Sequence, residues 1–88
     1  MAQPATGLEF PCRYPVKVMA VAGPQIRDQV LAIVSAYGEF SKAEDVRCRP
    51  SRTGRFESIT VTVQIESRER LEELYAALGR LDAVKMML

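Results

Sequence analysis

The chain has 88 residues, of which 48% are hydrophobic and 26% charged, and its net charge is +1. This composition is typical of one ordinary soluble globular domain. It has no His and only two Cys, and no apolar run approaches the ~20 residues of a membrane span. We therefore expect no metal site, no disulfide framework and no membrane helix, and a cytoplasmic protein.

The chain is predicted to begin with a tail and a strand. Residues 1–7 are small, polar and proline-containing, which predicts a disordered tail before a single domain over residues 8–88. Residues 14–21 then alternate as a strand does. The face expected to point into the core holds Val16, Val18 and Ala20, and the other face holds Lys17, Met19 and Val21.

A helix is predicted to follow this strand. Gly23 and Pro24 mark its start, because proline loses nothing in the first turn, where its missing N–H has no partner. Gly38 falls where a left-handed C-terminal cap is expected. Apolar residues recur at helical spacing between these ends, and the buried stripe is predicted to be Ile26, Val30, Ile33, Val34 and Tyr37.

The next predicted elements are a short strand over residues 46–50 and a hairpin turn over residues 51–54. Val46 and Cys48 alternate with two arginines, so we expect the Cys48 side chain to be a buried, inert thiol. The proline and the arginines suit an edge strand. Gly54 is available for the positive φ that a tight turn requires.

The clearest pattern lies in the third predicted strand and the elements after it. Ser67 is a good N-cap for a second helix that ends at Gly79. Three rows are expected to face the core: Ile59, Val61, Val63 and Ile65 from the strand; Leu71, Leu74, Tyr75 and Leu78 from the helix; and Val84, Met86 and Leu88 from a last strand.

The order strand, helix, strand, strand, helix, strand predicts an α+β, ferredoxin-like βαββαβ sandwich. Both helices are expected to cover one face of an antiparallel sheet, and right-handed crossovers give the strand order 4-1-3-2. The other face stays open as an apolar strip in a polar and basic frame. Its candidate interaction residues are Lys17, Met19, Val21, Thr60, Thr62 and Met87.

Several short segments, taken together, resemble one known family. They are Leu8-Glu9-Phe10-Pro11, Lys17-Val18-Met19, Pro50-Ser51 with Gly54, Ser58-Ile59-Thr60-Val61, Leu74-Tyr75 with Leu78, and Asp82-Ala83-Val84-Lys85-Met86. In this order and spacing the chain resembles the YbeD family of small bacterial proteins. The resemblance implies an ACT-like, ferredoxin-like domain and a regulator associated with the lipoate pathway.

A regulatory, ligand-binding module is the first hypothesis that follows. The resemblance to ACT-like domains implies a small-molecule site where the first strand meets the first helix. A helix N-terminus there would favour a carboxylate. The residues of this candidate site are Val21, Ala22, Gly23, Pro24 and Gln25.

Two further hypotheses use other surfaces. The open sheet face is a candidate surface for a protein partner or for a homodimer. RNA binding ranks lower, because the outward positions Lys17, Met19, Ser58, Thr60 and Thr62 of the central strands hold no aromatic residue on which bases would stack. Only Phe56 could serve in that role. The phosphate contacts would then come from the basic hairpin, whose residues are Arg47, Arg49, Arg52 and Arg55.

Catalysis is the hypothesis that the sequence supports least. General acid–base work usually relies on His, which the chain lacks, and the pattern places no pair of carboxylates inward. We therefore expect a protein that is not an enzyme, needs no cofactor and acts by binding an unknown small molecule or protein.

Overall fold

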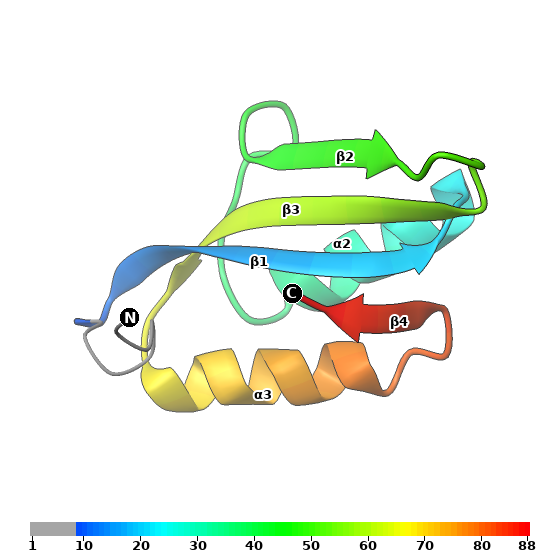
Figure 1. Cartoon of the computed structure of the whole chain (residues 1–88). Helices are drawn as coiled ribbons and strands as arrows, with labels where there is room; N and C mark the ends of the chain where they lie inside the picture. Colours follow the sequence, from blue (N-terminus) through cyan, green and yellow to red (C-terminus); the bar gives the residue numbers. More distant parts are fainter. Residues whose placement is uncertain (1–8) are drawn as a thin grey trace, which may run out of the picture.

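The computed structural model describes residues 9–88, so the predicted tail over residues 1–7 lies outside the described residues. Six elements follow in the predicted order: β1 (Cys12–Val21), α2 (Pro24–Ser35), β2 (Val46–Pro50), β3 (Phe56–Ile65), α3 (Arg68–Gly79) and β4 (Val84–Met87). The strands form one antiparallel sheet in the order β2-β3-β1-β4 (Figure 1). The predicted ferredoxin-like α+β fold and its strand order are confirmed.

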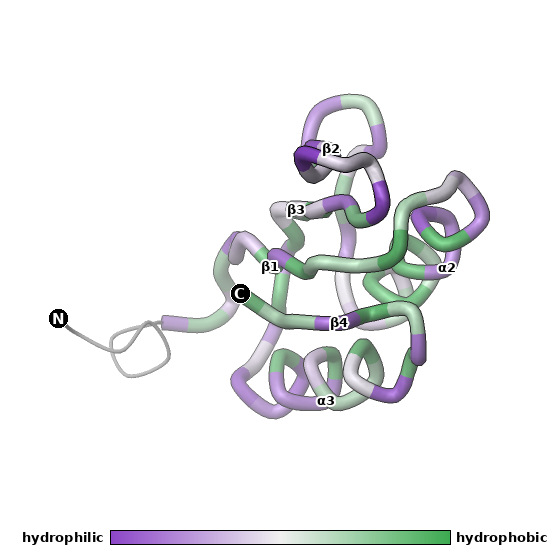
Figure 2. Tube along the Cα trace, turned by 45° about the vertical axis from the view of Figure 1, so that its right-hand side comes forward, coloured by the Kyte–Doolittle hydropathy of each residue, from purple (hydrophilic) through white to green (hydrophobic). Residues whose placement is uncertain are grey.

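The core lies between one face of the sheet and the two helices. Figure 2 shows hydrophobic segments gathered where the strands meet α2 and α3. Full burial of a Val, Leu or Ile side chain contributes about 1.5–3 kcal/mol. The buried side chains are Val16, Val18 and Ala20 of β1, Ile59, Val61, Val63 and Ile65 of β3, Val30, Leu31 and Val34 of α2, and Leu71, Leu74 and Leu78 of α3.

The helices follow the sequence prediction with one exchange. Val30 and Val34 are buried, and Ile33 and Tyr37 pack partly buried against the core, as expected. Leu31 takes the buried place that was predicted for Ile26, which stays partly exposed in the first turn of α2. The buried arc of α2 is therefore centred nearer the middle of the helix than its pattern suggests.

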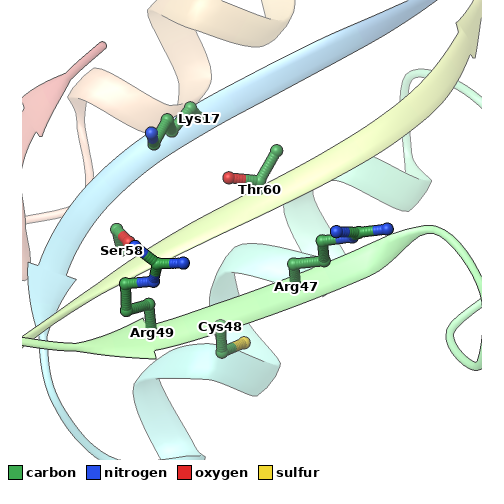
Figure 3. Close-up of a pocket in the computed structure, with 6 residues that line it drawn as sticks. All are labelled: Lys17, Arg47, Cys48, Arg49, Ser58 and Thr60. Atoms are coloured by element: carbon green, nitrogen blue, oxygen red, sulfur yellow. The ribbon is translucent and has the colours of Figure 1, made fainter.

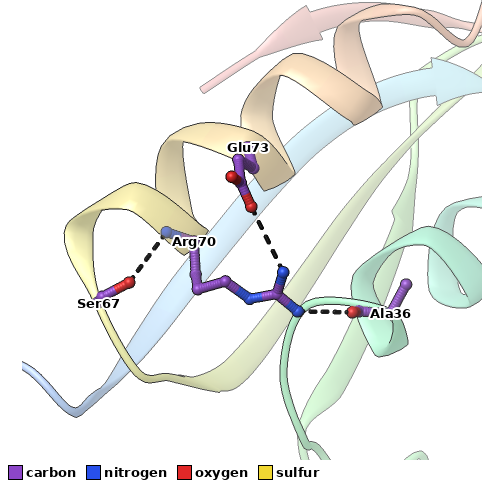
Figure 4. A network of polar contacts seen from close by, with 4 residues as sticks. All are labelled: Ala36, Ser67, Arg70 and Glu73. Atoms are coloured by element: carbon purple, nitrogen blue, oxygen red, sulfur yellow. Dashed lines mark hydrogen bonds and ion pairs between the residues drawn. The ribbon is translucent and has the colours of Figure 1, made fainter.

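Arg70 joins the two helices (Figure 4). Ser67, the predicted N-cap of α3, accepts a hydrogen bond from the Arg70 backbone N–H at 3.1 Å. The Arg70 guanidinium donates to the Ala36 carbonyl oxygen just after α2 at 2.9 Å and lies 4.8 Å from the centre of the Tyr37 ring. This contact satisfies a carbonyl at the end of α2 and adds a cation–π interaction.

Gly38 is not the left-handed cap that was predicted, because the glycines of the described residues with positive φ are Gly23 and Gly54. A Cβ on Gly38 would instead collide with the Gln64 carbonyl oxygen and would lie 2.7 Å from Cγ2 of Val63. The residue after Gly38 is held against β3, since the Gln64 N–H donates to the Glu39 carbonyl at 2.9 Å. Glycine is therefore required here by close backbone approach.

At Gly54, φ is 78°, as the hairpin prediction required.

A register shift changes which residues of β4 face the helices. The shift lies between Met19 and Ala20 of β1, and it places Val84 opposite Ala20 but Met86 opposite Met19. Val84 is partly buried against the core, as predicted. The extra residue of the bulge is Lys85, so the alternation beyond it is reversed.

The prediction that Met86 and Leu88 face the core is therefore wrong, and each residue is 52% exposed. Met87 stands opposite the buried Val18, and its Cε lies 3.4 Å from where a Cβ of Gly79 in α3 would be. Met87 thus leaves the open face, on which the sequence pattern had placed it. Residues opposite one another in antiparallel strands share a face.

Cys48 is exposed, so the prediction of a buried thiol is wrong. Its side chain shares the helix-facing side of the sheet, because Cys48 stands opposite the buried Ile59. β2 is an edge strand that pairs with β3 alone, and neither helix packs closely over it. An inward position at this edge therefore does not bury the side chain.

We expect Gly38→Ala to lower the free energy of unfolding by about 1–3 kcal/mol, because the added methyl group must displace the β3 backbone or Val63. Gly79→Ala is the matched control, since its methyl group would meet only the end of Met87 at 3.4 Å. Urea unfolding of both variants checks this. Equal stability of the two variants would contradict the close approach.

Candidate ligand-binding face

Two rows of side chains cross the open face of the sheet from β2 to β4. Strand pairing places each residue opposite the next, and the last link is the hydrogen bond of 2.8 Å from the Leu88 N–H to the Lys17 carbonyl. One row is Arg47, Thr60, Lys17 and Leu88, and the other is Arg49, Ser58, Met19 and Met86. The face is therefore basic over β2, hydroxyl-lined over β3 and largely apolar over β4.

The polar part of these rows forms a shallow hollow, which we call the basic basin. It encloses about 460 Å³ and consists of Lys17, Arg47, Arg49, Ser58 and Thr60. Cys48 also borders this volume, but Figure 3 shows its side chain directed away from the other five, on the side of α2. The basin thus gathers two guanidinium groups, one ammonium group and two hydroxyls on one surface.

The positive charge of the basic basin is not neutralised within residues 9–88. The ion pairs found there join Arg13 to Asp45, Arg27 to Glu57 and Arg70 to Glu73, and none includes Lys17, Arg47 or Arg49. The only carboxylate within the four strands, Glu57, lies on the opposite face. Charges of one sign gathered in a hollow attract and concentrate ligands of the opposite sign.

Asp45, the loop carboxylate directly before β2, is already engaged at the other end of the sheet. Asp45 accepts hydrogen bonds from the Ser41 N–H at 2.8 Å and from Nη2 of Arg13 at 2.6 Å. The Ser41 hydrogen bond, together with the Arg13 charge, holds the pKa of Asp45 below its usual value. These groups lie around Gln64, which is four residues, or about 13 Å, along β3 from Thr60.

Beside the basin lies an uncovered apolar strip, which we define as Met19, Met86 and Leu88. Met19 is half-buried between its neighbours, whereas Met86 and Leu88 are each 52% exposed. Val21 continues the strip toward the end of β1 and is half-buried beside Phe56. An apolar surface bordered by polar groups is typical of an interaction site.

The residues of the predicted ligand site at the β1–α2 junction lie outside the basic basin. Val21, Ala22 and Gly23 are half-buried, and Pro24 and Gln25 are exposed at the start of α2. Gly23 has a φ of 146°, and a Cβ there would meet no atom within 4 Å. The junction is therefore accessible, but none of its five residues lines the basic basin.

The four arginines of the predicted basic hairpin are divided by the structure. Arg47 and Arg49 lie in β2 and line the basin, whereas Arg52 and Arg55 are exposed in the turn between β2 and β3. Thr62, another predicted open-face residue, stands opposite Pro15 beyond the basin. Arg47 and Arg49 can therefore act together with Lys17, and the two turn arginines are separate.

A buried ion pair was not foreseen from the sequence. Glu57 is 5% exposed, and its Oε2 accepts from Nε of Arg27 at 2.9 Å and lies 2.7 Å from Nη2. Partial desolvation of the Sγ atom, in a residue that is exposed as a whole, and the neighbouring Glu57 carboxylate both raise the pKa of the Cys48 thiol. The inward position of Glu57 could have been read from the sequence, because Glu57 lies two residues before Ile59 in the same strand and so shares its inward face.

The family relationship of the chain is shown by comparison with known proteins. Residues 5–88 match the model of a family described as protein of unknown function DUF493. The chain belongs to the DUF493 family. This agrees with the YbeD resemblance found in the sequence, and the family description includes no activity.

Relatives of this DUF493 protein include a UPF0250 protein from Yersinia pestis strain Pestoides F, 39% identical over 83 residues, which cover 92% of this chain and 91% of the relative. The UPF0250 protein SG0794 from Sodalis glossinidius is 37% identical over 83 residues, which cover 92% of this chain and 91% of that relative. The solution structure of HP0495 from H. pylori matches with a TM-score of 0.70 at 16% identity, over 100% of this chain and 97% of that one. The last likeness concerns the fold alone.

Two further features of residues 9–88 bear on other kinds of site. Neither helix of the described structure is long and apolar enough to cross a membrane. Within the same residues, no three His, Cys, Asp or Glu side chains gather in a way that could hold a metal ion.

We expect Arg27→Ala to lower the free energy of unfolding by about 2–3 kcal/mol, since it leaves the buried Glu57 carboxylate without its partner. The loss is smaller than for a fully buried pair because the Arg27 side chain is 40% exposed. The double variant Arg27→Met/Glu57→Leu should recover most of the stability in urea unfolding. A single variant as stable as the parent protein would disprove the role of this pair.

The lowered pKa of Asp45 predicts a pH-dependent contribution to stability. A carboxyl group whose folded pKa is depressed stabilises the fold above its unfolded value of about 3.9, and this contribution is lost as the pH falls through the folded pKa. Asp45→Asn should therefore be less stable than the parent protein at neutral pH, and the difference should narrow below about pH 4. Urea unfolding across this range measures it, with the exposed Glu44→Gln as control. A difference independent of pH would contradict the prediction.

Proposed function

We propose that this DUF493 protein is a non-enzymatic regulatory module that binds an anionic ligand or partner on its open sheet face. The observation that carries the proposal is the basic basin, where Lys17, Arg47 and Arg49 make no ion pair within residues 9–88. The apolar strip beside it supplies area for a ligand that is not purely polar. A structural charge cluster would be expected to include carboxylates, and this one does not.

The chemistry of the remaining polar groups supports binding rather than catalysis. The chain has no His, and the buried Glu57 is held by Arg27. The pKa of the Cys48 thiol is raised, which disfavours the nucleophilic thiolate. Both cysteines are free thiols, in keeping with our proposal that the protein acts in the reducing cytoplasm.

A sensor of a small carboxylic acid is a second candidate function. It is favoured because each of the two rows is basic at its β2 end and apolar at its β4 end. A carboxylate at Arg47 and Arg49 would place an acyl chain across β1 toward Leu88 and Met86. Such a ligand would suit the lipoate-pathway role that the YbeD resemblance implies. The β1–α2 junction, residues 21–25, is the alternative position for the same class of ligand.

Amide spectra of ¹⁵N-labelled protein test the proposal, with octanoate, lipoate, a short polyglutamate peptide and a short RNA added separately. We expect at least one carboxylate compound to shift the amides of Lys17, Arg47 and Thr60. Arg47→Glu/Arg49→Glu should weaken that binding by about tenfold or more. The matched control, Arg52→Glu/Arg55→Glu, changes the net charge equally but lies in the turn, and it should change the affinity by less than about threefold.

The contrary outcomes are also distinct. Shifts confined to residues 21–25 would move the site to the β1–α2 junction and overturn the proposal for the sheet face. Equal losses in the two double variants would reduce the effect to general charge attraction. No shift on the open face with any of these anions would refute a binding role for the basin.

A further inference from the structure

We propose that the partner on the open face is an amphipathic acidic helix of another protein, lying along the strands across the two rows. This inference rests on the proposed function and specifies its ligand. The helix would direct carboxylates toward Arg47 and Arg49 over β2, and apolar side chains toward Met86 and Leu88 beside β4.

The charge of the rows requires anionic groups on one side of the partner. Arginine binds carboxylates through two parallel N–H groups, and it stays charged at any physiological pH. Arg47 and Arg49 present two such groups on one edge of the face, with Lys17 as a third cation near the centre. A partner without anionic groups would desolvate these cations with no compensation, and in an unmodified protein helix the anionic groups are carboxylates.

The spacing of the rows fits a helix. Arg47 and Arg49 are two residues apart in a strand, which is about 7 Å, and carboxylates four residues apart on a helix are separated by about 6 Å along its axis. Three strand spacings between β2 and β4 give a face about 14 Å wide, close to the helix diameter of about 10–12 Å. One helix would therefore cover both the basin and the apolar strip.

A second copy of this chain is a poorer occupant than a foreign helix. Facing sheets would bring no strand carboxylate to the arginines, since Glu57 lies on the helix-covered side. α3 exposes Glu69, Glu72 and Glu73, but its apolar side is already buried against the sheet. Neither surface offers acidic and apolar groups side by side.

RNA and small acids also fit less well. The eight residues of the two rows include no aromatic side chain for base stacking. Phe56 lies on the same face beyond the rows, but it is half-buried opposite Val21. The basin is a shallow part of a sheet surface, whereas small-ligand sites bury about 70–90% of the ligand. A helix needs no such enclosure, because it gains affinity from an extended contact.

The test uses a labelled peptide of about 18 residues, with Glu along one side and Leu along the other. Its control is a scrambled peptide of the same composition, and binding is measured by fluorescence anisotropy and amide shifts. We expect shifts at Lys17, Arg49 and Met86, and binding of the scrambled peptide that is at least about tenfold weaker. The affinity for the helical peptide should fall by about tenfold in each of two double variants, Arg47→Glu/Arg49→Glu and Met86→Ser/Leu88→Ser. In the control variant Arg52→Glu/Arg55→Glu it should fall by less than about threefold.

The outcomes separate this inference from the proposed function. Equal binding of both peptides, or a Met86→Ser/Leu88→Ser variant that binds as the parent does, would overturn the amphipathic helix and leave a basin for acidic ligands in general. Open-face shifts with octanoate, lipoate or RNA but not with the peptide would overturn the helix in favour of that ligand. No open-face shift with any of these compounds would refute both proposals.

Discussion

The apolar row of β3 must be covered, and covering it uses both helices of the domain. Ile59, Val61, Val63 and Ile65 alternate without interruption, so all four side chains lie on one side of a strand in the middle of the sheet. α2 and α3 bury that side together with the inward residues of β1. The second face consequently receives no helix, and its polar and basic residues remain available to another molecule.

One extra residue decides what that available face contains. The bulge between β1 and β4 turns Met86 outward and Met87 toward α3. The apolar end of the two rows therefore lies beside Lys17 and Met19, and the polarity changes across the sheet from β2 to β4. Bulges commonly redirect side chains near interaction surfaces in this way.

The features that could be predicted from the sequence are those with a local cause. The alternation of β3, the cap at Ser67 and the positive φ of Gly54 each depend on a few neighbouring residues. The missed features depend on tertiary arrangement. Gly38 is constrained by the β3 backbone and Cys48 is exposed at a sheet edge. Met86 and Met87 lie on the faces opposite to those predicted, because a register shift reverses the alternation, and a strictly alternating pattern does not reveal such a shift.

The central place of β1 has a consequence for how the chain folds. Val16 stands opposite Val61, 45 positions later in the sequence, and β4 joins the other side of β1 only after α3 has formed the connection. Such pairings close long loops before they gain contacts, which slows folding relative to a helical bundle of equal size. During synthesis β1 emerges before either neighbour, with Val16, Val18 and Ala20 uncovered on one side and both edges unpaired. The early chain is thus more exposed to wrong association than the finished domain, in which each edge of β1 is occupied.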